Sequence, residues 1–346
     1  MTGRASDPLR LALIGAGRIG SAYAAAAAGL REVRLVAVAD VDPRRAAAVA
    51  DICGAEPRSD WRDALGSGAE AVLICTPPCW HAEQAMAAAE RGLHVLCEKP
   101  LALNVREAME MIDTARRRGV LLTMASKFRY VDDIPKARAL IDSGEIGDVV
   151  LLENSFTSRL DLTGRWNADP AISGGGVLID NGTHSVDIVR CLLGPIEAVR
   201  AVVISLTAPG GVEDTVHMFA RCAAGPMASV HLSWRFDRRS RSYLDIYGSA
   251  GVVRVGWRGS WYRRDRDEKW IRFGRGYDKI RALRKQLAGF ARAVRGREPL
   301  AVSDQDALAS VEVIAAAYRA VRSGGWEAVG SQGATVSAAP SPESGR

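Results

Sequence analysis

A glycine-rich turn near the amino terminus constrains the fold of this 346-residue chain more than any other feature. The segment Gly15-Ala16-Gly17-Arg18-Ile19-Gly20 follows the apolar run 11–14 and opens an alanine-rich stretch that is typical of a helix. A strand, a tight glycine turn and a helix in this order are typical of a βαβ unit that binds a dinucleotide pyrophosphate on backbone N–H groups. The turn therefore predicts a parallel sheet with a ligand at its strand ends.

An acidic residue follows this turn at the distance that a dinucleotide site requires. Asp40 lies 20 residues after Gly20, at the end of the next apolar run. A carboxylate at this position accepts hydrogen bonds from ribose hydroxyls and repels a 2′-phosphate. The sequence therefore predicts NAD as the cofactor. NADP is a less favoured alternative that Arg44 and Arg45 keep open, and a glycine turn that binds nothing is the third interpretation.

Short apolar runs alternate with helical stretches over the first 126 residues. The expected strands are 11–14, 35–39, 71–75, 94–97 and 121–125, and the expected helices are 21–30, 43–52, 81–91 and 105–118. Continuous apolar strands separated by helices indicate a parallel sheet that is covered on both faces. We therefore expect residues 1–126 to form an α/β dinucleotide-binding Rossmann domain.

The pattern changes after residue 126. The expected strands are 149–156, 198–206, 215–222, 228–234, 242–247 and 251–255, and helical stretches are expected at 134–143, within 173–193, at 278–295 and at 303–323. Consecutive strands without intervening helices indicate a mostly antiparallel sheet. We expect residues 127–330 to form an α+β domain with a large open sheet for substrate binding and oligomerisation. The Ser-, Gly-, Ala- and Pro-rich residues 331–346 should be a disordered tail.

Two further segments place polar groups directly after strands of the first domain. Cys75-Thr76-Pro77-Pro78 ends one strand, and Glu98-Lys99-Pro100 ends the next. Because the carboxyl ends of parallel strands share one edge, Thr76 and Pro77 should line the cofactor. Lys99 can hydrogen-bond a substrate hydroxyl there and stabilise an alkoxide that develops on it. A structural turn and a surface Lys-Pro pair are the alternative interpretations.

A second polar pair closes the glycine-rich run at 173–184. Asp180 and His184 are four residues apart, so on a helix they share one face. A histidine that titrates near neutrality suits general acid–base chemistry, and a nearby carboxylate can orient it or hold a second hydroxyl. A metal pair is the rival interpretation, but Asp187 is the one further ligand within reach, so no metal is predicted. A buried core histidine is the structural alternative.

The net charge of +6 is concentrated in one segment. Residues 254–297 carry fifteen Lys and Arg against four acids, with aromatic residues between them. Such a segment can be a solvated sheet face, a subunit interface or the rim of a pocket for an anionic substrate. No nucleic-acid-binding motif accompanies the charge, so a nucleic-acid partner is not predicted.

The spacing of the cysteines and the hydropathy of the chain indicate the cellular compartment. None of the six cysteines shows the C-x-x-C spacing of a zinc site, which favours reduced thiols. The first residues lack the apolar stretch of a secretory signal, and no apolar run approaches the roughly 20 residues of a membrane span. We therefore expect a cytoplasmic protein without a membrane partner.

Together these segments resemble the glucose–fructose oxidoreductase / inositol dehydrogenase / MocA family. The resemblance covers roughly residues 9–325 and rests on G-A-G-R-I-G at 15–20, C-T-P-P at 75–78, E-K-P at 98–100 and S-G-G-G-V-L-I-D-N-G-T-H at 173–184. It implies an amino-terminal Rossmann domain and a second domain whose large sheet commonly makes subunit contacts. A homodimer or homotetramer is therefore expected.

The resemblance also implies roles for individual residues. Lys99, Asp180 and His184 match the catalytic residues of the family and would also bind substrate, together with Lys127 and Trp166. The predicted cofactor-binding residues are Gly15, Gly17, Arg18, Ile19, Gly20, Asp40, Thr76, Pro77, His81, Glu98 and Lys99. At 126–129 the sequence Ser-Lys-Phe-Arg departs from the Asn- and Arg-rich version that is common in the family.

The sequence thus predicts an NAD-dependent dehydrogenase that acts on CH–OH groups. The hydride would move between nicotinamide and a secondary hydroxyl or ketone of a polyhydroxylated small molecule, namely a sugar, aminosugar or cyclitol. A ketoreductase of a nucleotide-linked keto-sugar is the alternative that the basic segment 254–297 motivates. A non-catalytic NAD-binding regulator is the alternative from another functional class.

Overall fold

The structure is a computed structural model that describes residues 7–206 and 208–330, and these form two compact units. The first unit comprises residues 7–102, 106–130 and 278–308, and the second comprises the other described residues. The tail expected at 331–346 lies outside the described residues. Within the described part of the chain, no helix combines the length and the apolar character that a membrane crossing requires.

The first unit is built on a parallel sheet, as the alternating pattern predicts. Its described strands run in the order β3-β2-β1-β4-β5-β6, and every neighbouring pair is parallel. Their bounds are β1 Leu9–Ile14, β2 Val33–Ala39, β3 Glu56–Arg58, β4 Ala71–Ile74, β5 His94–Cys97 and β6 Leu122–Met124. All the carboxyl ends therefore lie along one edge, and the strand order reverses between β1 and β4, where ligands of such sheets bind.

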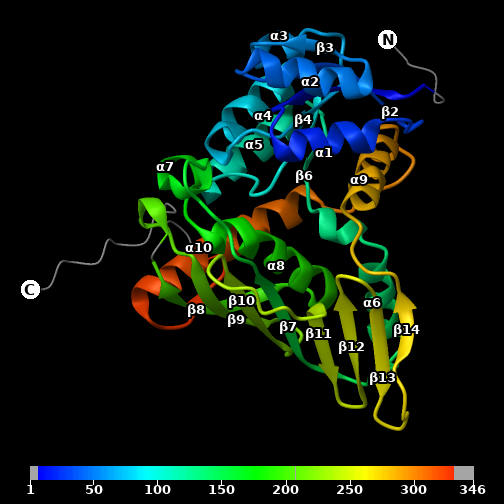
Figure 1. The fold of residues 1–346 in the computed structure, drawn as a ribbon, viewed down its shortest axis with the longest axis vertical. Coiled ribbons are helices and arrows are strands. Elements are labelled where there is room, and N and C mark those ends of the chain that lie inside the picture. Colours follow the sequence, from blue (N-terminus) through cyan, green and yellow to red (C-terminus); the bar gives the residue numbers. More distant parts are fainter. Residues whose placement is uncertain (1–6, 207, 331–346) are drawn as a thin grey trace, which may run out of the picture. The chain divides into compact units, whose positions relative to one another are not determined.

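Helices cover this sheet and complete its core. They are α1 Arg18–Ala27, α2 Pro43–Cys53, α3 Trp61–Leu65, η1 Pro78–Trp80, α4 His81–Glu90, α5 Val105–Arg117 and η2 Lys127–Tyr130. A late segment joins them: α9, Lys279–Val294, lies beside α1 (Figure 1), and its Leu283, Leu287 and Phe290 belong to the same buried cluster as Leu11 and Leu13. The division expected at residue 126 placed this helix in the second domain, whereas its contacts place it in the first unit.

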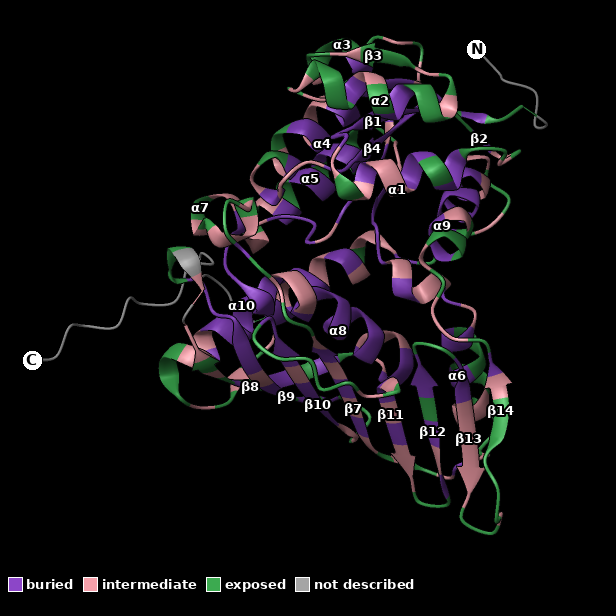
Figure 2. Cartoon of the chain, in the orientation of Figure 1, coloured by how far each residue is buried: buried purple, intermediate pink, exposed green. Residues whose placement is uncertain are grey.

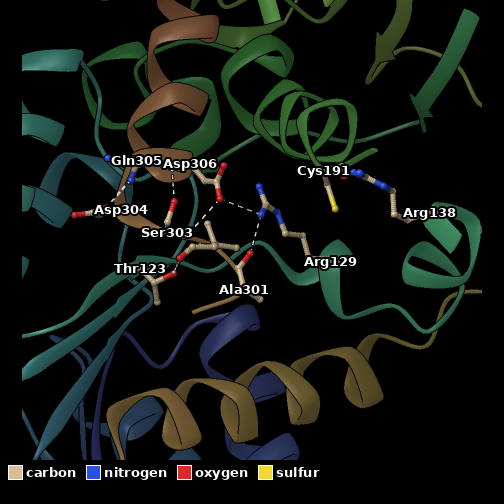
Figure 3. A network of polar contacts seen from close by, with 10 residues as sticks. Thr123, Arg129, Arg138, Cys191, Ala301, Ser303, Asp304, Gln305 and Asp306 are labelled. Atoms are coloured by element: carbon tan, nitrogen blue, oxygen red, sulfur yellow. Dashed lines mark hydrogen bonds and ion pairs between the residues drawn. The ribbon is translucent and has the colours of Figure 1, made fainter. Parts of the chain in front are cut away.

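Residues 301–306, which follow α9, make polar contacts with β6 and η2 of the first unit (Figure 3). The Thr123 hydroxyl at the end of β6 donates to the carbonyl of Val302 at 2.7 Å. The Arg129 guanidinium in η2 donates to the carbonyl of Ala301 at 2.7 Å and pairs with Asp306 at 3.2 Å. Arg129 therefore fixes η2 and the start of the last long helix, α10 Asp304–Ser323.

The second unit contains a large mixed sheet, as expected for the second half of the chain. Its described strands run in the order β14-β13-β12-β11-β7-β10-β9-β8-β15. β7 and β10 are parallel, and the other neighbours are antiparallel. The bounds are β7 Val149–Thr157, β8 Ile196–Ser205, β9 Thr215–Cys222, β10 Met227–Ser233, β11 Ser242–Gly248, β12 Gly251–Gly256, β13 Ser260–Arg264, β14 Ile271–Gly274 and β15 Glu327–Ala328.

One helix, α8 Val177–Leu193, packs along β7, β9 and β10 and is mostly buried (Figure 2). The other helices of this unit are α6 Asp133–Asp142, η3 Trp166–Ala168, α7 Pro170–Ser173, η4 Pro209–Gly211 and most of α10. Buried residues alternate with more exposed ones along β7, β8 and β9, because α8 covers one face of the sheet. The other face is the open one, and Phe219 and Val202 are exposed on it.

Candidate active site

The glycine turn has the geometry that its sequence predicts. Gly15 has a φ of +96°, and a Cβ there would lie 2.6 Å from the carbonyl carbon of Cys75, so no other residue fits. A Cβ at Gly20 would collide with the carbonyl oxygen of Gly15. At Gly17, by contrast, a Cβ would meet no described atom within 4 Å. The turn is thus packed on the protein side and open where a phosphate group would approach.

The start of α1 and Asp40 complete the features that a dinucleotide needs. Gly17 is the N-cap of α1 and offers no side-chain acceptor, so the first N–H groups of the helix remain donors for an anion. The Asp40 carboxylate accepts from the N–H groups of Ala16 at 2.7 Å and Asp42 at 2.9 Å. Each oxygen keeps a further lone pair for a ribose hydroxyl. The residues present therefore fit NAD.

His81 connects the two turns that follow β4 and β5. Its side chain is fully buried, with Nδ1 2.8 Å from the carbonyl oxygen of Pro100 and Nε2 3.0 Å from that of Thr76. Burial lowers the pKa of this imidazole, although both carbonyl groups act in the opposite direction. Both ring nitrogens thus lie against backbone carbonyl oxygens, so His81 connects the Thr76 and Lys99-Pro100 turns, and its contact with the cofactor stays a prediction.

Glu98 is also directed into the first unit. It is 7% exposed, and its carboxylate accepts from the Tyr23 hydroxyl at 3.1 Å and from the backbone N–H of Lys99 at 3.0 Å. Burial raises the pKa of Glu98, while the nearby charges of Lys127 and Lys99 act to lower it. The Glu98 carboxylate is therefore held by Tyr23 and by the Lys99 backbone, and its contact with the cofactor stays a prediction.

Lys99 and Lys127 follow neighbouring strands of the same edge. Lys99 comes two residues after β5, and Lys127 opens η2 after β6. Thr76 follows β4 on the same edge, and its hydroxyl donates to Gln84 at 2.7 Å. The first unit therefore gathers the glycine turn, Asp40, Thr76 and both lysines at the carboxyl ends of its strands, as the order of the motifs predicts.

In the second unit, Asp180 and His184 lie one turn apart on α8. Asp180 is half-buried in the first turn, and His184 is 8% exposed. The Phe156 ring of β7 contacts His184 edge-on, with centroids 6.4 Å apart. The helix expected within 173–193 therefore presents both residues as the four-residue spacing predicts. In the described residues, no cluster of three or more His, Cys, Asp or Glu side chains has the arrangement of a metal site.

The start of α8 is anchored by Glu213, a residue that the sequence did not point to. Its carboxylate Oε1 accepts from the N–H groups of Gly176 at 2.9 Å and Leu178 at 3.1 Å and from the Tyr318 hydroxyl at 2.7 Å. A Cβ at Gly176 would collide with the Glu213 backbone, and one at Gly175 would collide with the Tyr318 hydroxyl. The glycine run before Asp180 is therefore needed for close packing around a buried carboxylate.

An aromatic cluster lies next to His184, and no sequence pattern predicted it. Phe156 stacks on Tyr243 at 5.8 Å, and Trp257 lies 4.7 Å from Tyr243. Trp257 meets Tyr277 edge-on at 5.7 Å. These rings come from β7, β11 and the two loops after β12 and β14, so their proximity follows from sheet order and not from a local motif. The predicted substrate residue Trp166 lies in η3 and is 42% exposed.

Several arginines of the basic segment 254–297 have structural partners. Arg254 lies 3.4 Å from Asp245 and 4.5 Å from the centre of the Trp270 ring. In the first unit, Arg295 of the same segment pairs with Glu70 at 2.9 Å. These contacts favour the interpretation of a solvated sheet face and a packed helix over that of a site for an anionic substrate.

Comparison with known proteins agrees with this geometry. The family described as "Oxidoreductase family, NAD-binding Rossmann fold" matches residues 9–126, and the "GFO/IDH/MocA C-terminal domain" matches residues 134–254. The chain is 31% identical to inositol 2-dehydrogenase of Rhizobium meliloti (strain 1021), over 71% of this chain and 74% of that protein. It is 30% identical to the rhizopine catabolism protein MocA of Rhizobium meliloti, over 89% of this chain and 93% of that protein.

A solved structure supports the fold. Levoglucosan dehydrogenase in complex with NADH and levoglucosan aligns with a TM-score of 0.86 at 24% identity, over 93% of this chain and 99% of that one. The parallel sheet, the glycine turn and Asp40 are the features of a dinucleotide-binding fold, and the family match identifies an NAD-binding oxidoreductase. More specifically, the chain belongs to the Gfo/Idh/MocA oxidoreductase family.

Proposed function

We propose that this protein oxidises a secondary hydroxyl of a sugar, aminosugar or cyclitol with NAD, or reduces the corresponding ketone. The observation that carries the proposal is the position of Lys99, two residues past β5 on the strand edge that also bears the glycine turn and Asp40. A lysine beside a hydride acceptor is suited to hold the oxygen of a reacting alcohol. Relatives named inositol 2-dehydrogenase and levoglucosan dehydrogenase support this substrate class.

The chemistry divides among three side chains. When bound, NAD supplies the nicotinamide carbon that accepts the hydride. Lys99 donates a hydrogen bond to the reacting oxygen and stabilises negative charge on it. His184 accepts the hydroxyl proton during oxidation and returns it during reduction, and Asp180 orients His184 or binds a second hydroxyl. We further propose that Lys127 and Trp166 contact substrate.

The proposed cofactor contacts come from residues at the carboxyl ends of the parallel strands in the first unit. The backbone around Gly15, Gly17, Arg18, Ile19 and Gly20 would hold the pyrophosphate. Asp40 would hold the adenosine ribose, while Thr76 and Pro77 would form a wall of the site. Since Asp40 would repel a 2′-phosphate, the protein should use NAD in preference to NADP.

A substrate screen tests this function directly. Purified protein should reduce NAD, measured by the near-ultraviolet absorbance of NADH, with at least one member of a panel of sugars, aminosugars and cyclitols, and reduce NADP more slowly. Failure with the whole panel, alongside turnover of a nucleotide-linked keto-sugar, would support the ketoreductase alternative. NADH binding without turnover of any compound would instead support the non-catalytic regulator.

We also infer that the open face of the large sheet joins copies of this chain into a homodimer or homotetramer. Val202, Ile204 and Phe219 are 53%, 66% and 40% exposed on β8 and β9, so three apolar side chains on neighbouring strands are open to solvent. Continuity of this patch with the half-buried His217 and His231 supports the same inference.

The cytoplasmic location expected from the sequence remains a prediction.

Replacing Phe219 with glutamate should shift the protein towards the monomer, because a charge would be buried in the interface. Sedimentation velocity over a concentration series measures the change. Exposed Glu268→Ala, in the turn between β13 and β14, serves as the control and should leave the assembly intact. An unchanged assembly in the Phe219→Glu variant would place the interface elsewhere.

A further inference from the structure

Four aromatic side chains of the second unit gather at one edge of the large sheet. β7, β12 and β14 run in one direction and β11 runs in the other, so the ends of the first three strands and the start of β11 share this edge (Figure 1). Phe156 lies near the end of β7, and Tyr243 lies near the start of β11. Trp257 and Tyr277 stand in the loops that follow β12 and β14. The topology of the sheet therefore brings together rings that are far apart in the sequence.

The rings of this cluster differ in burial. Phe156 and Tyr243 are 6% and 1% exposed, whereas Trp257 is 39% exposed. The centre of the Trp257 ring lies 6.1 Å from that of Phe156 and 4.7 Å from that of Tyr243. Phe156 in turn contacts the His184 ring at 6.4 Å. Trp257 is thus the exposed end of a continuous run of rings that reaches the residue proposed for acid–base chemistry.

The surroundings of Trp257 also differ from those of other tryptophans. Guanidinium groups lie 4.2–5.8 Å from the ring centres of Trp61, Trp261, Trp270 and Trp326. Within the described part of the chain, the ring contacts of Trp257 are instead with the aromatic side chains of its cluster. A guanidinium over an indole occupies its face with a charge. The exposed part of Trp257 is therefore suited to the apolar face of a small molecule.

Hydrogen bonds fix the backbone that carries Trp257 and Tyr277. The N–H of Trp257 donates to the carbonyl of Arg241 at 3.1 Å, and the carbonyl of Trp257 accepts from the N–H of Tyr277 at 3.1 Å. The buried Asp133 carboxylate accepts from the N–H of Gly276 at 2.8 Å. Gly276 has a φ of +96°, and a Cβ there would lie 2.6 Å from the carbonyl oxygen of Trp257. Both rings are thus held in place before a ligand arrives, which reduces the entropy lost on binding.

The shape of this surface indicates which ligand fits. The Trp257 and Tyr277 rings meet at an interplanar angle of 87°, with their centres 5.7 Å apart, so they form a corner. A pyranose or cyclitol ring with equatorial hydroxyls presents axial C–H groups on its faces, and such a face gains free energy when an indole covers it. An open-chain polyol has no comparable rigid face. The corner therefore favours a cyclic substrate.

We propose that Trp257 and Tyr277 form a binding platform for the C–H face of a cyclic substrate. The platform makes the protein select sugar and cyclitol rings over open-chain polyols with the same number of carbons and hydroxyls. This deepens the proposed function and rests on it, since His184 defines the reacting end of the site. Neither Trp257 nor Tyr277 handles the proton or the hydride, so both determine binding and leave the chemical step to other residues.

Fluorine NMR of protein labelled with 5-fluorotryptophan tests the platform without requiring turnover. The Trp257 resonance is the one that Trp257→Phe removes. With NADH bound, which leaves alcohols unreacted, myo-inositol, D-glucose and D-glucosamine serve as cyclic probes and sorbitol as the open-chain probe. At least one cyclic probe should shift the Trp257 resonance, and sorbitol at the same concentration should leave it in place. Trp270, which Arg254 covers, provides the reference resonance and is identified by Trp270→Phe.

Steady-state kinetics with the cyclic substrate found in the screen give a second measurement. Trp257→Ala should raise KM about tenfold and leave kcat within about threefold, because it removes binding that the ground state and the transition state share. Trp257→Phe keeps a smaller ring and should raise KM by less. Trp270→Ala removes an exposed tryptophan at another place in the second unit and should leave KM unchanged.

The possible outcomes are distinct. A Trp257 resonance that no cyclic probe shifts would overturn the platform, as would an unchanged KM in Trp257→Ala. A shift with uridine diphosphate and none with the cyclic probes would also overturn it and would identify a nucleobase as the ligand of Trp257. A shift with a cyclic probe but no turnover of any compound would support the platform while the proposed function fails. Turnover of a cyclic substrate with an unmoved resonance would have the reverse meaning.

Discussion

Lys99→Ala and His184→Ala should each lower kcat for the substrate found in the screen by roughly 100- to 10,000-fold, the range that loss of a positioned acid or base produces. Without Lys99, the oxygen of the reacting alcohol loses the cation that is proposed to stabilise its developing charge. Without His184, the hydroxyl proton loses its proposed acceptor. NADH binding should change little in the His184 variant, because the glycine turn and Asp40 belong to the other unit.

Two matched variants separate chemistry from packing. Lys136→Ala removes a lysine of α6 whose ammonium donates to the carbonyl of Phe273 at 3.1 Å. His94→Ala removes a half-buried histidine at the start of β5, whose Nδ1 accepts from the N–H of Leu121 at 2.9 Å. Steady-state kinetics should find both controls within about threefold of wild type. Near-normal turnover in Lys99→Ala or His184→Ala would show that the assigned roles are incorrect.

Local sequence signals predicted the parts of the fold that local physics determines. The strands 94–97 and 215–222 have the observed bounds, and the glycine turn has the positive φ at Gly15 that its pattern requires. Each of these depends on residues that are close in the chain. The same holds for Asp180 and His184, whose four-residue spacing on α8 follows from helix geometry.

The strands β3, β13 and β14 were not predicted, because their local sequences carry weak or misleading signals. β3 contains Pro57 and is a three-residue edge strand without apolar alternation. β13 and β14 lie at the other sheet's edge, and their many arginines made the segment resemble a charged surface. Edge strands need less apolar surface than central strands, since fewer neighbours cover them. Charge was therefore a poor guide to secondary structure there.

Contacts between distant segments were beyond any sequence pattern. Gln286 was expected on a helix of the second domain, and no local feature indicated that this helix packs on α1. Glu213 stands in the short connection between η4 and β9, and Tyr318 on α10 is 105 residues away. A buried carboxylate of this kind is recognisable only when the groups that satisfy it are known.

Replacing Glu213 with alanine should lower the free energy of unfolding by about 3 kcal/mol, because it leaves buried donors without an acceptor. The N–H groups of Gly176 and Leu178 and the Tyr318 hydroxyl all donate to one Glu213 oxygen. Gly176, the N-cap of α8, has no side chain to replace it. Since Asp180 lies in the first turn of α8, turnover should fall together with stability.

Glu213→Gln separates the hydrogen bonds from the charge. The amide keeps an acceptor oxygen, so this variant should lose less stability than Glu213→Ala in urea denaturation. Burial raises the pKa of Glu213 above its ordinary value of 4.5. The stability that protonated Glu213 contributes is therefore complete below the unfolded pKa and declines as the pH rises through the folded one. Wild type should accordingly lose stability relative to Glu213→Gln as the pH rises from about 4.5 towards neutrality. Exposed Glu268→Ala should match wild type, and a Glu213→Ala variant as stable as that control would mean that Glu213 does not anchor α8.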